Sequence, residues 1–143
     1  MCSLAAIALS SCEASDNGDL DGMWYLTAVD SLQAASDVHV SMKGKSHTWA
    51  FQADLVQFFN YDEDHWDGDI LMGRFDCGGG QLIIRDPFIY DRMDGDRFLT
   101  LDTLPYLSAH GINSLPDTFA IERLDRRHLR ISDHLVRLHF DKY

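Results

Sequence analysis

Apolar and polar residues alternate along most of this 143-residue chain, and alternation with a period of two is typical of strands that bury one face. Residues 23–29 follow this pattern, with Trp24, Leu26 and Ala28 on one face. Asp-Gly pairs and the glycines at 78–80 separate such runs and predict turns. Further strands are expected at residues 70–76, 81–86, 97–101, 119–124, 128–132 and 135–143.

The run 47–61 alternates most clearly and is predicted to form one strand. That strand would place Trp49, Phe51, Ala53 and Leu55 on the same face. A helical spacing fits this run less well, and its aromatic residues favour a strand.

About eight such strands follow one another without the alternation of strands and helices that marks a parallel sheet. The predicted class is therefore all-β, an antiparallel barrel or sandwich. Residues 102–109 break the pattern: Asp102 is expected to cap a short helical segment, which Pro105 limits to a turn or two. The length suits one domain with its own core.

The N-terminal segment has the features of an export signal. Six apolar residues, 4–9, run into "LSSC", which begins at Leu9 and resembles the lipobox of bacterial lipoproteins. This resemblance would make Cys12 the lipidated first residue of the mature protein. The apolar core is short and no Lys or Arg precedes Glu13, so this signal looks truncated. The expected organisation is a signal peptide at 1–11, an acidic flexible tether at 12–20 and a barrel domain at 21–143.

The start of the first strand carries a family resemblance. Gly22 and Trp24 form a G-x-W motif that resembles the opening of lipocalin-type barrels, and the three closing runs form a meander. With the lipobox, the chain resembles the small lipocalin-like lipoproteins of Bacteroidetes. The resemblance implies an antiparallel up-and-down β-barrel in which Gly22 lets the chain turn in and Trp24 plugs the closed end. It also implies a basic residue of the last strand on that tryptophan, expected to be Arg137, with Arg130 as the alternative.

The net charge and the cysteine spacing limit the kinds of partner and metal that this protein is expected to bind. The formal net charge of −11 argues against nucleic acid, whose binding needs many Lys and Arg side chains. Cys2, Cys12 and Cys77 lack the spacing of a zinc site. Residues 62–69 are rich in carboxylates but lack the late glutamate of a calcium loop, so a solvated hairpin loop is favoured over a cation site.

Motifs for catalysis or metal binding are missing from the sequence. The seven histidines are scattered without an HxxxH or HExxH pattern, so no metal ligand and no cofactor is expected. No G-x-S-x-G motif is present and nothing selects a catalytic carboxylate pair, so no catalytic residue is assigned. An enzyme would require polar groups such as Gln52, Asp54 and Arg74 to point into the barrel.

Two functions remain. In the first, the protein is an outer-membrane lipoprotein of the cell envelope that binds a small apolar ligand, with Trp49, Phe51 and Phe75 lining the cavity. In the alternative, these rings fill the barrel as core, because an eight-stranded barrel is only just wide enough for side chains or one small ligand. The protein would then be a non-catalytic module that meets a protein partner at the cell surface.

Overall fold

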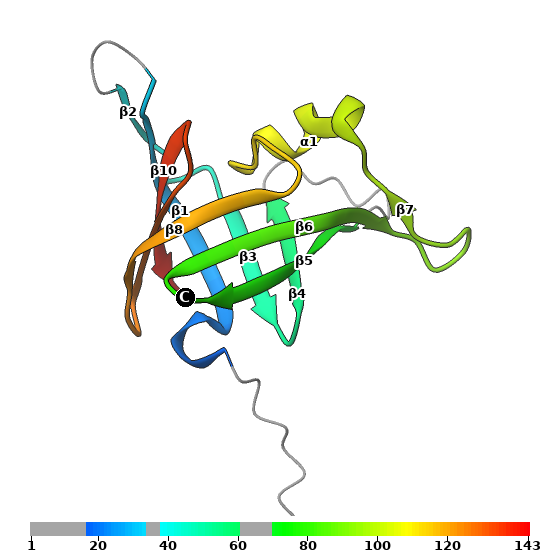
Figure 1. Ribbon diagram of the computed structural model, residues 1–143, viewed down its shortest axis with the longest axis horizontal. Coiled ribbons are helices and arrows are strands. Elements are labelled where there is room, and N and C mark those ends of the chain that lie inside the picture. The colour runs from blue at the N-terminus through cyan, green and yellow to red at the C-terminus, as the bar shows by residue number, and fades with distance from the viewer. Residues whose placement is uncertain (1–16, 34–37, 61–69) are drawn as a thin grey trace, which may run out of the picture.

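The computed structural model describes residues 17–33, 38–60 and 70–143, which form a closed antiparallel barrel (Figure 1). Its eight strands are β1 (Gly22–Ser31), β3 (His47–Gln52), β4 (Leu55–Asn60), β5 (Ile70–Gly78), β6 (Gln81–Tyr90), β8 (Asp117–Leu124), β9 (His128–Ser132) and β10 (Val136–Lys142). Each pairs with the next barrel strand along the chain, and β10 pairs with β1 to close the barrel. The predicted up-and-down barrel is therefore confirmed.

Five short elements complete the described part of the chain. They are η1 (Gly18–Leu20), β2 (Val38–Ser41), β7 (Arg97–Phe98), η2 (Leu101–Thr103) and α1 (Leu104–Ser108). The short helical segment expected at 102–109 is present, with Pro105 in the first turn of α1. No helix among the described residues is long and apolar enough to cross a membrane.

The prediction of one strand over 47–61 is wrong. The run folds into the β3–β4 hairpin, in which Gln52 pairs with Leu55 and Ala53 adopts a left-handed backbone with φ of 55°. Ala53 is exposed and Leu55 only partly buried, while Val56 and Phe58 enter the core instead. Apolar and polar residues alternate in both halves of the run, and no Gly or Pro lies at the turn. The sequence pattern therefore did not indicate the turn.

Two smaller differences concern short strands. The strand expected at 97–101 ends after Phe98, because Thr100 and Thr103 form a capping box that starts η2. β2 was not expected: its four residues alternate between apolar and polar, but the run is short and the structure exposes all of them. A register shift between β5 and β6 lies at Gly73, between Met72 and Arg74.

Candidate functional site

One end of the barrel is closed by η1 against Trp24. The indole is fully buried, and its Nε1 donates a hydrogen bond to the Leu20 carbonyl at 2.7 Å. Leu20 is itself fully buried, which fixes the short helix across the barrel end (Figure 1). Trp24 therefore lies in the core directly beneath η1.

The cation on Trp24 is Lys142, and the expectation of Arg137 is wrong. Lys142 Nζ lies 4.9 Å from the Trp24 ring centroid and donates to the Asp19 carbonyl. Gly22 makes this approach possible, because it has a φ of +113° and a Cβ there would lie 3.1 Å from Lys142 Cε.

Arg137 points to the outside of the barrel. It forms a two-pronged ion pair with Glu122, which also receives Arg130. Strand alternation explains the difference, because Phe140 and Lys142 share the inward face of β10 while Arg137 lies on the other face. Counting from the last buried aromatic residue would have identified the lysine.

The barrel interior is filled with aromatic rings around Trp49. This side chain is fully buried, and four rings surround it at centroid distances of 5.0–6.2 Å: Phe51, Phe58, Phe119 and Phe140. Phe51 in turn packs edge-on against Phe75 at 5.0 Å. The three residues predicted to line a ligand cavity are thus joined by ring contacts, and their role in binding remains a prediction.

The segment after α1 covers the other end of the barrel. Leu107 and Ile112 are fully buried in the core, and the His110 carbonyl accepts a hydrogen bond from Trp49 Nε1 at 2.9 Å. Gly111 allows this path, since its φ is +94° and a Cβ would lie 2.8 Å from Leu138 Cδ1. Residues 107–112 therefore act as a plug.

Two acidic side chains meet beside the plug, in the part of the structure where β8 begins. Asp117 is 1% exposed, and its carboxyl group is in hydrogen-bonding reach of Asp133, in the loop between β9 and β10. Burial and the neighbouring Asp133 raise the pKa of Asp117 to about 7. Asp117 can therefore keep its proton close to neutral pH.

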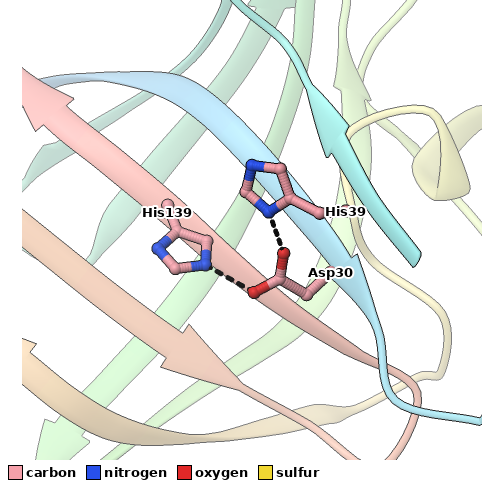
Figure 2. Close-up of side chains that lie close together, drawn as sticks. All are labelled: Asp30, His39 and His139. Atoms are coloured by element: carbon pink, nitrogen blue, oxygen red, sulfur yellow. Dashed lines mark hydrogen bonds and ion pairs between the residues drawn. The ribbon is translucent and has the colours of Figure 1, made fainter. Parts of the chain in front are cut away.

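A cluster of three titratable side chains lies on the outer face of the barrel, where β2, β1 and β10 lie side by side. Asp30 of β1 binds His39 of β2 and His139 of β10, one imidazole at each carboxylate oxygen (Figure 2). The distance from His139 Nε2 to Asp30 Oδ2 is 2.7 Å. Burial raises the pKa of Asp30 and the two hydrogen bonds lower it, with a net result below its ordinary value. The sequence did not reveal this group, because barrel closure brings His139 beside a residue 109 positions away.

The remaining predicted residues are dispersed. Gln52 is exposed, and Asp54 and Arg74 form an exposed ion pair, so these polar groups do not point into the barrel. Cys77 is an exposed free thiol. Cys12, the signal, most of the tether and the acidic loop 62–69 lie outside the described residues.

A closed up-and-down barrel with a buried tryptophan under a short helix and a basic residue over it defines the lipocalin class. The chain matches the family model described as "Lipocalin-like domain" over residues 7–143, and it belongs to this family. The comparison with curated proteins found no match.

Two solved structures share the fold. One is a lipocalin-like protein from Bacteroides uniformis, with a TM-score of 0.58 and 20% identity, covering 88% of this chain and 100% of that chain. The other is an uncharacterized protein from Bacteroides eggerthii, with a TM-score of 0.55 and 15% identity, covering 87% of this chain and 99% of that one.

Proposed function

We propose that this protein is a lipid-anchored module of the cell envelope that binds a protein partner with the outer surface of a filled barrel. The observation that carries the proposal is the packing of Trp49, which is fully buried and ringed by aromatic side chains. A ligand inside the barrel would have to displace this ring and break its hydrogen bond to the plug. Such displacement would cost about 3–5 kcal/mol, the range for emptying an aromatic core position.

The connection between β6 and β8 offers the apolar surface that a partner needs. Met93, Phe98, Leu101 and Tyr106 are each at least 67% exposed. Exposed large apolar side chains gathered on one segment are typical of interaction sites. The C-terminal end of this connection is anchored to the barrel, because Leu107 is buried in the core.

An anchor at Cys12 would display this connection away from the membrane. The Asn17 side chain donates a hydrogen bond to the Ala53 carbonyl, in the β3–β4 turn at the end of the barrel that η1 covers. Because Cys12 precedes Asn17 by five residues in the sequence, we propose that this end of the barrel faces the membrane. The connection carrying β7 and α1 lies on the opposite side of the barrel (Figure 1). Diacylation would then hold the protein stably at the bilayer.

Two experiments test this proposal. A photo-crosslinking amino acid at Phe98 or Tyr106 is expected to capture an envelope protein in cells, whereas one at exposed Asp76 on the other end of the barrel is the control. Equal capture at all three positions would contradict the proposed surface. For the anchor, Cys12→Ser is expected to shift the protein from the membrane fraction to the soluble fraction, and an unchanged distribution would refute lipidation.

The apolar-ligand alternative is tested on the purified protein. Titration with a fluorescent fatty acid is expected to show no saturable binding with one site per barrel. Saturable binding that Trp49→Ala abolishes would instead favour a ligand inside the barrel.

A further inference from the structure

We propose that Asp30, His39 and His139 form a binding site for a divalent transition-metal ion, with zinc as the best-suited candidate. Each residue offers one ligand atom, and these atoms all lie within 4.8 Å of one another. The three side chains converge from β1, β2 and β10 on the same outer face of the barrel (Figure 2).

The donor set fits zinc in kind. Two imidazole nitrogens and one carboxylate oxygen are ligands that zinc accepts, and the same combination of two histidines with a carboxylate occurs in zinc sites that leave the fourth position open. The chain as a whole carries a net charge of −11, which favours the approach of cations.

The geometry needs only a small adjustment. Zinc bonds of about 2 Å place tetrahedral ligand atoms roughly 3.3 Å apart. Since the ligand atoms lie within 4.8 Å of one another, the widest pair must close by at most about 1.5 Å. The His39 side chain is 62% exposed and can rotate to do so, whereas the Asp30 side chain is 19% exposed and held in place. The imidazole nitrogens that now face Asp30 are His39 Nδ1 and His139 Nε2. An ion between them would replace those two contacts.

The site would also serve a mechanical role. In the described part of the sheet, β2 pairs only with β1, through Ala28 to Ser31. An ion that joins His39 to Asp30 and His139 would tie β2 to the seam between β1 and β10 that closes the barrel. Binding of the metal to the folded state alone would then stabilise the protein.

The test is isothermal titration of tag-free protein with ZnCl₂, comparing the wild type with His139→Ala, His39→Ala and Asp30→Asn. His128→Ala is the matched control, because His128 also pairs with one carboxylate, Asp125, at 3.2 Å, and the described residues offer no third ligand there. Circular dichroism checks that each variant is folded.

The expected result is one zinc ion per chain, with affinity lowered at least about tenfold in each of the three site variants and unchanged in His128→Ala. Zinc should also raise the melting temperature of the wild type, and this increase should disappear in His139→Ala. NMR resonances of the His39 and His139 rings should shift while those of His128 stay in place. Zinc affinity that is equal in the wild type and the folded site variants would overturn the proposal, as would the absence of binding to the wild type.

Discussion

Replacing Asp117 by Asn should stabilise the protein above neutral pH and change its stability little at pH 4. Asp117 Oδ2 accepts a hydrogen bond from the Asn113 backbone N–H at 2.9 Å. Asp133 Oδ1 accepts from the backbone N–H groups of Leu135 and Val136. Among the described residues, Asp117 Oδ1 and Asp133 Oδ2 accept no hydrogen bond, so a proton on Asp117 supplies one between the two carboxyl groups. An asparagine amide supplies that donor at every pH.

The direction of this change in stability with pH follows from proton binding. The ordinary pKa of this group is 3.8, and in the folded protein burial and Asp133 raise the pKa of Asp117 to about 7. Between these values the folded protein keeps a proton that the unfolded chain has lost. The contribution of Asp117 to the free energy of unfolding is therefore fully present below pH 3.8 and declines until pH 7. At about 1.4 kcal/mol per pKa unit, the loss is at most about 4 kcal/mol.

Urea unfolding between pH 4 and pH 8, followed by the fluorescence of buried Trp24 and Trp49, measures this effect. The difference in unfolding free energy between Asp117→Asn and the wild type should be near zero at pH 4 and rise toward about 4 kcal/mol at pH 8. Taking the difference removes the titration of all other groups.

Asp125→Asn is the matched control with the opposite sign. Backbone N–H groups, first that of Arg127, hold the pKa of Asp125 well below its usual range, so its stabilisation is present at neutral pH and lost in acid. This variant should therefore be less stable than the wild type by a nearly constant amount from pH 8 to pH 4, and the difference should shrink only below pH 3.8. A pH-independent difference for Asp117→Asn, or destabilisation at pH 8, would refute the reasoning.

Two further predictions concern the barrel ends. Gly111→Ala should lower the free energy of unfolding by about 1–3 kcal/mol, because the new Cβ lies 2.8 Å from Leu138 Cδ1 on a left-handed backbone; an unchanged thermal melting temperature would contradict the close packing of the plug. Lys142→Met should cost about 0.5–2 kcal/mol through loss of the cation over Trp24 and should shift the tryptophan emission spectrum. Arg137→Met should leave that spectrum unchanged, and a shift equal to that of Lys142→Met would restore Arg137 as the residue on Trp24.

The all-β fold could be predicted because most of its strands bury one face. Leu26 and Phe140, for example, sit on strands whose buried residues alternate with partly exposed ones. β2 escaped prediction because it buries nothing. The turn at Ala53 escaped because a non-glycine residue takes the left-handed conformation there.

The sites were harder to predict than the strands, since each depends on register between distant segments. Trp24 could be identified from a local motif, but its partner Lys142 depends on which face of β10 points inward. The meeting of Asp30 with His139 needs closure of the barrel through the β1–β10 pairing. Separation of 109 residues leaves no spacing in the sequence that could signal it.

The central claim is that side chains fill the barrel interior, and xenon binding to crystals tests it most directly. Xenon occupies apolar cavities without requiring a chosen ligand. The account predicts no xenon among Trp49, Phe51 and Phe75 in the wild type, and a new xenon site in Trp49→Ala, where the indole is removed. A xenon atom among these three rings in the wild-type crystal would contradict the filled barrel.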